Sequence, residues 1–476
     1  MPPYACLTLL CVLTLGGCAS ENPLPLSATT GPNPTLPPPS DRLIPRVNVA
    51  PVHGWPAGAK PQAAQGMQVT AFATGLDHPR WVYVLPNGDV LVAETAPPPR
   101  PQARKGIKGR VMGFFLKRAG SAVPSANRIT LLRDADGDGV AEVRATFLEN
   151  LNSPFGMWLH GGELYVANTD AVLRFPYRAG ETTLEAPGVK VADLPAGPRN
   201  HHWTKNIIVS PDGSKLYATV GSNSNVAEHG IEEEAGRAAI WEIDLKNGQR
   251  RIFASGLRNP NGLAWEPKTG ALWTVVNERD ELGDNLVPDY LTTVKDGGFY
   301  GWPYSYFGAH LDPRVEPQRP DLVARAIKPD YALGNHVAPL GLTFAQGSRL
   351  PPPFTEGAFI GQHGSWNRTP RSGYNVVFVP FKNGRPAADD PIEVLSGFVN
   401  DKGQALGRPV GVAIDKRGGL LVADDVGNAV WRVAGAAQST VNEAAGAATK
   451  SKTATSETTK SESATSHMAT KAAAPR

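Results

Sequence analysis

Short runs of apolar or alternating residues, separated by Gly, Pro, Asn and Asp, fill the middle of the chain. No long stretch repeats its apolar positions every ~3.6 residues, as an amphipathic helix would. One unit recurs instead: a polar or proline-containing lead, a short apolar strand, a tight turn with glycine, and a second strand of the Leu-x-Val-Ala type. This pattern predicts strands joined by turns, and therefore an all-β fold.

Six copies of this unit can be aligned. They are HPRWVYVLPNGDVLVAET from His78, SPFGMWLHGGELYVANT from Ser153, HHWTKNIIVSPDGSKLYATVGS from His201, NPNGLAWEPKTGALWTVVNE from Asn259, APLGLTFAQGSRLPPPFTEGAFIGQHGSW from Ala338 and RPVGVAIDKRGGLLVADD from Arg408. Their starts lie roughly 50 to 80 residues apart, which leaves room for a four-stranded blade with insertions. Six copies predict a six-bladed β-propeller whose leading loops, one before the first strand of each blade, gather at one end of the axial channel.

The amino-terminal segment MPPYACLTLLCVLTLGGCAS carries an apolar run that is too short to span a bilayer and suits the core of a secretory signal, residues 1–18. It ends in LGGC, which resembles a bacterial lipobox, so we expect Cys18 to be lipidated; a signal peptide with an ordinary small-residue cleavage site is the alternative. All three cysteines, Cys6, Cys11 and Cys18, lie in this segment. The mature chain therefore has no thiol for a disulfide, a metal or nucleophilic catalysis.

Composition divides the rest of the chain into three parts. Residues 19–66 are rich in Pro, Ala and Ser, and we expect an extended, disordered tether. Residues 67–434 are expected to form the propeller. Residues 435–476 contain no aromatic residue and predict a disordered, low-complexity tail. With a lipid on Cys18, we expect an exported protein held on the periplasmic side of a bacterial envelope membrane.

The leading loops have a composition that suits an anionic ligand. They hold His201 and His202 in the third copy, Arg258 at the fourth and Arg408 in the sixth. Guanidinium groups bind carboxylates through paired hydrogen bonds and stack on planar rings, while a neutral histidine can act as a general base. The alternative is that these arginines pair only with strand-end carbonyl groups. The formal net charge of +3 is too small to indicate nucleic-acid binding.

Five segments carry a family resemblance. They are GLRNPNGLAWEP (256–267), NERDELGDNLVPDYL (277–291), GGFYGWPYSYFG (297–308), GQHGSWNRTPRSGYNVVFVPF (361–381) and GRPVGVAIDKRGGLLVADD (407–425). In this order they resemble the soluble sugar dehydrogenases that depend on pyrroloquinoline quinone (PQQ), most closely the branch usually called L-sorbosone dehydrogenase. That family is a six-bladed propeller, which agrees with the six copies of the repeat.

The resemblance implies roles for residues of the third and fourth copies. Counting back from the PDG turn places the family's general base at His202, whereas counting by the distance to the next basic residue favours His201. Lys205 stands where the branch has arginine, and it is implied to bind the cofactor. Arg258 and Asn259 in GLRNP are implied to contact the quinone end of the cofactor, and Arg258 to take part in catalysis.

The carboxylates of the cofactor are bound in the family by arginine and lysine. Arg408 in GRPVG matches one family arginine, and the second aligns with Val410. The family lysine aligns near QHGSWNR, where His363 or Arg368 is implied to serve.

Two segments are candidates for calcium. The resemblance implies a calcium ion at the loop NERDELGD, bound by the main-chain oxygens of Arg279 and Asp280 with Asp284 nearby; hard oxygen ligands suit this ion. Separately, DADGDG (134–139) has carboxylates at alternate positions, like the start of an EF-hand loop, but Ala145 occupies the twelfth position. A structural ion and a plain acidic turn both remain open there.

The implied activity is oxidation of an aldose or a sorbosone-like sugar to a lactone or acid, with electrons passing through PQQ to an acceptor that the sequence does not identify. Two other classes remain open. A gluconolactonase-like hydrolase is also a metal-using six-bladed propeller, although it needs carboxylate and amide ligands on the axis. A propeller that binds a sugar or a protein without catalysis is the third possibility, because a fold does not determine a function.

Overall fold

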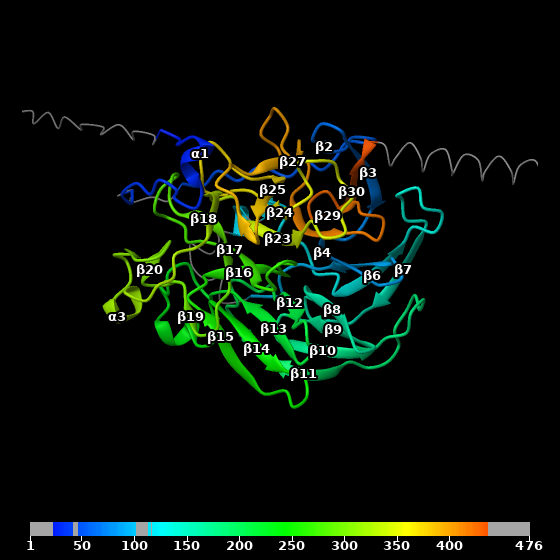
Figure 1. Ribbon diagram of the computed structural model, residues 1–476, viewed down its shortest axis with the longest axis horizontal. Coiled ribbons are helices and arrows are strands. Elements are labelled where there is room, and N and C mark those ends of the chain that lie inside the picture. Colours follow the sequence, from blue (N-terminus) through cyan, green and yellow to red (C-terminus); the bar gives the residue numbers. More distant parts are fainter. Residues whose placement is uncertain (1–21, 41–45, 101–112, 116, 437–476) are drawn as a thin grey trace, which may run out of the picture.

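The computed structural model describes residues 22–40, 46–100, 113–115 and 117–436. Six antiparallel sheets follow one another around a ring, in the order of the chain (Figure 1). The first two strands of each sheet fall within one of the six aligned copies. The prediction of a six-bladed all-β propeller is therefore confirmed.

Each blade contains four main strands, which follow one another from the axis outward. Blade 1 has β4 (Pro79–Val84), β5 (Val90–Glu94), β6 (Arg128–Arg133) and β7 (Val143–Leu148); blade 2 has β8 (Met157–His160), β9 (Glu163–Ala167), β10 (Ala171–Pro176) and β11 (Val189–Asp193). Blade 3 has β12 (Ile207–Val209), β13 (Lys215–Val220), β14 (Ala239–Asp244) and β15 (Arg250–Ser255); blade 4 has β16 (Asn259–Trp265), β17 (Leu272–Asn277), β18 (Pro288–Thr293) and β22 (Tyr331–Asn335). Blade 5 has β23 (Pro339–Phe344), β24 (Gly357–Gln362), β25 (Asn375–Lys382) and β27 (Ile392–Ser396); blade 6 has β28 (Pro409–Ile414), β29 (Leu420–Asp424), β30 (Ala429–Gly435) and β3 (Met67–Thr74).

Smaller elements decorate these blades. β1 (Thr30–Gly31) pairs with β22, β2 (Gln62–Ala63) with β27, β19 (Gly298–Phe299) with β15 and β26 (Arg385–Pro386) with β25, while β20 (Ser305–Tyr306) and β21 (His310–Leu311) pair with each other. The helices whose bounds are defined include α1 (Leu26–Thr29), α3 (Pro320–Val323) and the 3₁₀ turn Ile231–Glu234. Among the described residues, no helix has the length and apolar character needed to cross a membrane.

The ring closes through strands from opposite ends of the chain. β3 precedes blade 1 in sequence but pairs with β30 as the outer strand of blade 6, so the first and last strands of the propeller share one sheet (Figure 1). Closure of this kind joins the ring without leaving a long free edge at the seam.

Neighbouring inner strands approach one another closely at a glycine of the repeat. A Cβ atom on Gly411 of β28 would lie 2.8 Å from the carbonyl oxygen of Arg80 on β4. The segments SPFG, NPNG and APLG carry glycine at the same place before or within their inner strands. Glycine within a strand often marks close approach of another backbone, and at these positions it allows the blades to converge on the axis.

The leading loops bend sharply just before the inner strands. His78, Ser153 and Ala338 have φ of 54°, 44° and 53°, in the left-handed region that residues with a Cβ rarely adopt. Such conformations persist only where the surrounding structure enforces them, and they are concentrated at functional sites. These turns direct the leading loops toward one end of the axis, which we call the axial opening.

Residues 22–40 and 46–66, expected to be part of a disordered tether, instead lie against blades 4, 5 and 6. The indole of Trp55 packs on Phe398 and Trp431, and its Nε1 donates to the carboxylate of Asp424 at 2.7 Å. Proline-rich segments lack a periodic apolar pattern, so the sequence offered little sign of this packing. The tether prediction is wrong for these ranges; Cys18 and the tail after residue 436 lie outside the described residues.

Candidate functional site

His202 is held by one ring nitrogen at the axial opening. Its Nδ1 lies 2.9 Å from the main-chain oxygen of Ser222 and 3.0 Å from Ser222 Oγ. Because Ser222 Oγ donates its own hydrogen to the oxygen of Ser224, both atoms accept from His202. Nδ1 must therefore carry the proton, which leaves Nε2 with a lone pair that can accept one.

The surroundings of His202 favour its neutral form. Burial lowers the pKa of His202 well below 6.5, and the positive charges near it, including Arg258, lower it further. Its hydrogen bond to Ser222 acts in the opposite direction but does not reverse the shift. At neutral pH the ring is therefore an unprotonated base with a fixed tautomer.

His201 differs from its neighbour in exposure and in contacts. Its side chain is exposed, and its ring packs edge-on against that of His202 with centroids 4.5 Å apart. The surrounding protein nevertheless lowers the pKa of His201, as do the charges of Arg258 and Arg100. Because His201 has no side-chain hydrogen bond to fix its tautomer among the described contacts, the geometry favours His202 as the base.

A glycine allows His202 and Asn259 to meet. A Cβ atom on Gly221 would lie 2.5 Å from the Cβ of His202 and would also overlap Asn259 Oδ1. Two side chains predicted to be in the site, from blades 3 and 4, therefore share the space beside this glycine. The Oδ1 atom of Asn259 is buried and has no hydrogen-bond partner in the protein.

On the blade 3–blade 4 side of the opening, Arg258 connects several loops through its hydrogen bonds. Its guanidinium donates to the main-chain oxygens of Asn225 and Glu278, at 3.1 and 2.5 Å, and to Asn225 Oδ1 at 2.9 Å. Nη2 also lies 3.1 Å from the carboxylate of Asp280. The side chain of Arg258 is buried. Its pairing with main-chain carbonyl groups matches the alternative interpretation from the sequence, and the residue also lies close to the two histidines.

The loop predicted to bind calcium is largely satisfied by protein donors. The main-chain oxygen of Asp280 accepts from Asn225 Nδ2 at 3.2 Å and from Arg314 Nη1 at 2.9 Å. The carboxylate of Asp284 pairs with Arg46 at 2.7 Å, and its main-chain oxygen accepts from Arg368 Nε at 2.8 Å. With these protein donors, the oxygens of Asp280 and Asp284 do not fit a calcium site in this arrangement, so the ion has no part in the proposed reaction steps; the main-chain oxygen of Arg279 stays a prediction.

The side chains of two other predicted residues are engaged within the protein, although the prediction for Arg279 concerned its main-chain oxygen. The guanidinium of Arg279 is fully buried and binds Glu278, Asp312 and the main-chain oxygens of Pro303 and Ser305. Lys205 is also fully buried, and its Nζ donates to the oxygen of Trp203 at 3.2 Å. Burial lowers the pKa of Lys205 well below its usual value. The structure therefore does not bring Lys205 to the site as a cationic ligand.

The opposite side of the opening, formed by blades 1, 5 and 6, contains Arg408 and His363. Arg408 Nη2 lies 3.2 Å from the hydroxyl of Tyr374, and its guanidinium stacks over that ring at 5.0 Å. His363 Nε2 lies 2.9 Å from the carboxylate of Asp425. Arg368, predicted as the alternative to His363, is instead bound to the loop at Asp284.

Sequence reasoning missed Arg80 and Asp425. Arg80 Nη1 donates to Asp425 at 2.6 Å, and its guanidinium lies between the rings of Phe155 and Trp203, at 5.9 and 5.8 Å. Asp425 directly follows β29, whose end lies beside the start of β28 because the two strands are antiparallel. Second strands therefore return to the same opening, and the residues that follow them could have been included in the search.

The polar atoms around the opening are consistent with a polar ligand. Buried side-chain atoms without a protein partner include Asn259 Oδ1, Arg80 Nε, Arg408 Nε and Asp425 Oδ1. Buried polar groups are normally hydrogen-bonded, so this group of atoms calls for partners from outside the protein. Two guanidinium groups and an amide suit a carboxylate-bearing planar ligand, and the site therefore fits PQQ.

The acidic turn at DADGDG lies apart from this site. Asp134, Asp136, Asp138 and Glu142 bring carboxylate oxygens within 4.8 Å of one another. Glu142, rather than a residue at the twelfth position, completes the group. Asp134 is also paired with Arg417 at 3.2 Å. The choice between an ion and a plain acidic turn stays open.

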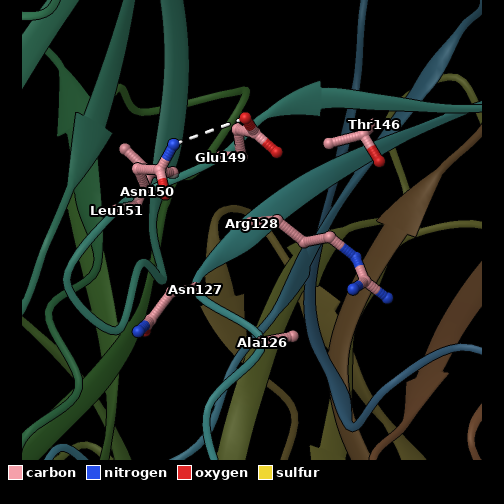
Figure 2. Close-up of a pocket in the computed structure, with 7 residues that line it drawn as sticks. All are labelled: Ala126, Asn127, Arg128, Thr146, Glu149, Asn150 and Leu151. Atoms are coloured by element: carbon pink, nitrogen blue, oxygen red, sulfur yellow. Dashed lines mark hydrogen bonds between the residues drawn. The ribbon is translucent and has the colours of Figure 1, made fainter.

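A surface hollow of about 510 Å³ lies at the outer strands of blade 1 (Figure 2). Its lining includes Arg128 of β6 and Thr146 of β7, with Asn127, Glu149 and Asn150 from the adjoining turns. None of the predicted site residues lines it. Arg128 is already paired with Glu94 at 2.8 Å, so the hollow does not present a converging catalytic set.

Known proteins share both sequence and architecture with this chain. An uncharacterised protein of Borreliella burgdorferi is 29% identical over 297 residues, which cover 60% of this chain and 77% of that protein. A PQQ-dependent pyranose dehydrogenase of Coprinopsis cinerea is 22% identical over 361 residues, 67% of this chain. The match spans only 44% of the length of that enzyme.

Two solved structures have the same fold. The calcium structure of Trichoderma reesei Carbohydrate-Active Enzymes Family AA12 superposes with a TM-score of 0.63 at 19% identity, covering 82% of this chain and 99% of that one. The holo form of the pyranose dehydrogenase PQQ domain from Coprinopsis cinerea gives 0.62 at 20% identity, covering 81% and 100%.

The family described as TrAA12-like matches residues 125–292 and 320–436, which is more than half of the chain. The match includes the loops that carry His202, Arg258, His363 and Arg408, but not Arg80. The chain belongs to the TrAA12-like family.

Proposed function

We propose that the protein is a PQQ-dependent dehydrogenase that oxidises an aldose or a sorbosone-like sugar to a lactone or acid. Relatives named as PQQ-dependent sugar dehydrogenases support the reaction class. The observation that carries the proposal is His202, a neutral histidine with a fixed tautomer, beside buried polar atoms that lack protein partners.

His202 is the general base of the proposed reaction. Its Nε2 takes the proton of the anomeric hydroxyl of the cyclic sugar, while Nδ1–H stays bound to the oxygens of Ser222. These two acceptors stabilise the imidazolium that forms, because a carbonyl dipole interacts more strongly with the charged ring than with the neutral one. When bound, PQQ supplies the quinone carbonyl carbon that accepts the hydride from the sugar.

Three residues would hold the cofactor. Arg408 and Arg80 supply guanidinium groups from blades 6 and 1, and Asn259 supplies an unpartnered amide oxygen beside His202. Arg258 orders the loop at Asp280 and adds positive charge where negative charge develops on the substrate and the reduced cofactor.

The location and electron partner are further parts of the proposal. A lipid on Cys18 would hold the enzyme on the periplasmic side of the envelope membrane, where an acceptor that we do not identify would take the electrons. Incorporation of labelled palmitate into the wild-type chain and its loss in Cys18→Ala would support the anchor. Equal labelling of both chains would contradict it.

The direct test uses the full chain with PQQ, an aldose panel and L-sorbosone. We expect saturable PQQ binding, bleaching of the oxidised cofactor by at least one sugar, and retained binding but lost bleaching in His202→Gln. Sugar-driven bleaching by His202→Gln at the wild-type rate would contradict the assignment of the base.

A further inference from the structure

The amino-terminal segment begins at the rim of the axial opening. We call residues 22–40 and 46–66 the strap. Asn285, in the connection from β17 to β18, holds its first residues: Nδ2 donates to the main-chain oxygen of Asn22 at 2.8 Å, and the main-chain N–H of Leu24 donates to Oδ1 at 3.1 Å. This connection follows the second strand of blade 4, and such connections lie at the opening. The strap is therefore fixed to the rim at its first described residue.

Further along, the strap stays at the same end of the propeller. Asn48 Nδ2 donates to the main-chain oxygen of Arg368 at 2.8 Å, in the connection that follows the second strand of blade 5. The main-chain N–H of His53 donates to the oxygen of Ala405 at 2.8 Å, shortly before the inner strand of blade 6. The strap thus follows the rim over blades 4, 5 and 6.

The short stretch of chain between Cys18 and the strap limits where a lipid could lie. Residues 19–21 separate Cys18 from Asn22. Four peptide units span at most about 14 Å in any conformation. A lipid on Cys18 would therefore hold the blade 4 rim within about this distance of the bilayer surface. A disordered tether reaching to residue 66 would have left the propeller free to turn, whereas the bound strap does not.

The strap exposes apolar side chains although polar contacts hold it to the blades. Leu26 of α1 is 54% exposed. The side chains of Arg46 and Asn48 both bind the protein, and Val47 between them is 36% exposed. Val52 is 39% exposed. A single exposed apolar side chain is ordinary on a protein surface, but these recur along one short segment.

A helical turn of the blade 1 insertion extends this apolar surface. Phe114 is 60% exposed, and its ring packs edge-on against that of Phe115. The same turn contacts the strap, because the main-chain N–H of Val52 donates to the oxygen of Arg118 at 3.0 Å. Lys117 and Arg118 are exposed as well. Apolar and aromatic side chains beside basic ones are typical of surfaces that lie in the headgroup region of a membrane.

We propose that the strap and Phe114 form the surface by which the propeller rests on a phospholipid bilayer, with the axial opening at the membrane side. The proposal rests on the lipid at Cys18, which belongs to the proposed function. The lipid holds the blade 4 end of the strap near the bilayer, and the apolar side chains enter the headgroup region. Lys117 and Arg118 attract anionic headgroups.

Two exposed valines at the opposite end of the blades provide matched controls. β6 begins beside the end of β5 at the opening, so its connection to β7, which contains Val140, lies at the other end. β11 begins at that same end with Val189. Val140 and Val189 are 38% and 52% exposed, close to the values for Val47 and Leu26.

The experiment uses the full chain, expressed in a bacterial host that processes lipoproteins. Mass spectrometry of the amino-terminal peptide first establishes whether Cys18 carries a lipid. The native cysteines all lie at or before residue 18, and the lipid blocks Cys18. A cysteine introduced elsewhere is therefore the only reactive thiol of the processed chain.

Five single variants receive an environment-sensitive fluorophore on the introduced cysteine: Leu26→Cys, Val47→Cys, Phe114→Cys and the controls Val140→Cys and Val189→Cys. Each is reconstituted on vesicles of phosphatidylcholine and phosphatidylglycerol. The fluorescence is compared between vesicles with and without a phosphatidylcholine that carries a nitroxide on its headgroup. The nitroxide quenches only labels that lie close to the bilayer surface.

We expect the nitroxide lipid to quench the labels of the strap and of Phe114→Cys by roughly half or more, and the two control labels by less than about a tenth. Removing phosphatidylglycerol should weaken quenching at Phe114→Cys more than at Leu26→Cys. The lipid anchor holds the region of Leu26, whereas the contact at Phe114 depends on the basic residues beside it.

Equal quenching at strap and control positions, or none at either, on a lipidated chain would overturn this surface and leave the proposed function standing. A chain without a lipid on Cys18 would remove the anchor from the proposed function and this surface with it. A blue shift of the Phe114→Cys label that grows with protein density, without quenching, would identify a second copy of the chain as the occupant and overturn the bilayer. PQQ reduction by sugar is assayed on the same vesicles, so failure of the dehydrogenase is seen separately from the orientation.

Discussion

The two sides of the axial opening are built in opposite ways. On the blade 3–blade 4 side, the guanidinium of Arg258 donates hydrogen bonds to Asn225, Glu278 and Asp280. On the blade 1–5–6 side, Arg408 and Arg80 keep buried Nε atoms without protein partners. The guanidinium of the first side is engaged by the protein, where Asn259 Oδ1 is the unpartnered atom named above, whereas both guanidinium groups of the second side keep a donor without a protein partner.

This difference separates preorganisation from binding. A general base needs a fixed tautomer and orientation before substrate arrives, and the satisfied network around His202 provides both. A ligand site needs polar atoms that the protein leaves unpaired, and Arg80 and Arg408 provide those. Substitutions on the two sides should therefore affect different measurements.

The strongest effect should be on turnover at the preorganised side. His202→Gln removes the proton acceptor and should lower kcat roughly a hundredfold or more, the usual contribution of a general base, with PQQ affinity nearly unchanged. Steady-state assays with an artificial electron acceptor measure the first quantity and absorbance titration the second. His201→Gln is the control and should retain most activity; the reverse result would make His201 the base.

Arg258→Ala should act mainly on stability. It removes the donor of the buried carbonyl oxygen of Glu278 and the charge partner of the Asp280 carboxylate, which keeps its hydrogen bond from Asn367, and loss of one partner from a buried pair costs about 3 to 5 kcal/mol. Urea unfolding followed by tryptophan fluorescence measures this. A loss of unfolding free energy below about 1 kcal/mol, on the order of a surface substitution, would mean that the hydrogen bonds of Arg258 do not stabilise the fold appreciably.

Arg408→Ala should act mainly on affinity. Its guanidinium has one side-chain hydrogen bond in the described contacts, to Tyr374, so less protein structure depends on it. We expect PQQ binding to weaken roughly ten- to hundredfold, the equivalent of one charge-assisted hydrogen bond, with a smaller loss of stability than in Arg258→Ala. Equal losses of stability in the two variants would contradict the idea that Arg258 stabilises the fold whereas Arg408 binds the ligand.

The pH profile should show the depressed basicity of His202. Its pKa is lowered by burial and nearby positive charge, so the ring stays unprotonated as the pH falls through 6.5 and loses activity only below that value. We expect kcat/KM to remain nearly constant between pH 8 and 6.5. An acid limb centred at or above 6.5 would show that the bound state does not keep this shift.

The weakest effect should be at Lys205, which lies outside both sides. Lys205→Met replaces a buried amine that has a lowered pKa with a side chain of similar length. PQQ affinity should change less than about threefold, because among the described residues the hydrogen bond of the buried Nζ goes to the oxygen of Trp203. A tenfold loss of PQQ affinity in a stable variant would restore Lys205 as a cofactor residue.

The repeat in the sequence was sufficient to predict the architecture, because each copy contains the inner hairpin of one blade. His202 and Arg258 could be found because leading loops are recognisable from the strands that follow them. Asp425 and Ser222 were harder to find, since they follow second strands and act through pairing across blades and loops.

Other features depend on contacts that no local pattern encodes. Arg314 reaches the oxygen of Asp280 from an insertion 34 residues away, and Arg46 pairs with Asp284 from the amino-terminal segment. These distant cations changed the interpretation of the calcium loop. Likewise, the proline-rich composition of residues 22–66 gave no sign that Trp55 packs against blade 6.

The decisive experiment for a quinone-dependent sugar dehydrogenase is to titrate the full chain with PQQ in calcium-containing buffer and then add the sugar panel under anaerobic conditions. We predict saturable binding, reduction of the cofactor by at least one aldose or L-sorbosone, and no reduction on the same timescale in His202→Gln. A folded chain that binds no PQQ would contradict the proposed activity, and reduction of the bound cofactor equally fast in His202→Gln would contradict the role of His202 in it.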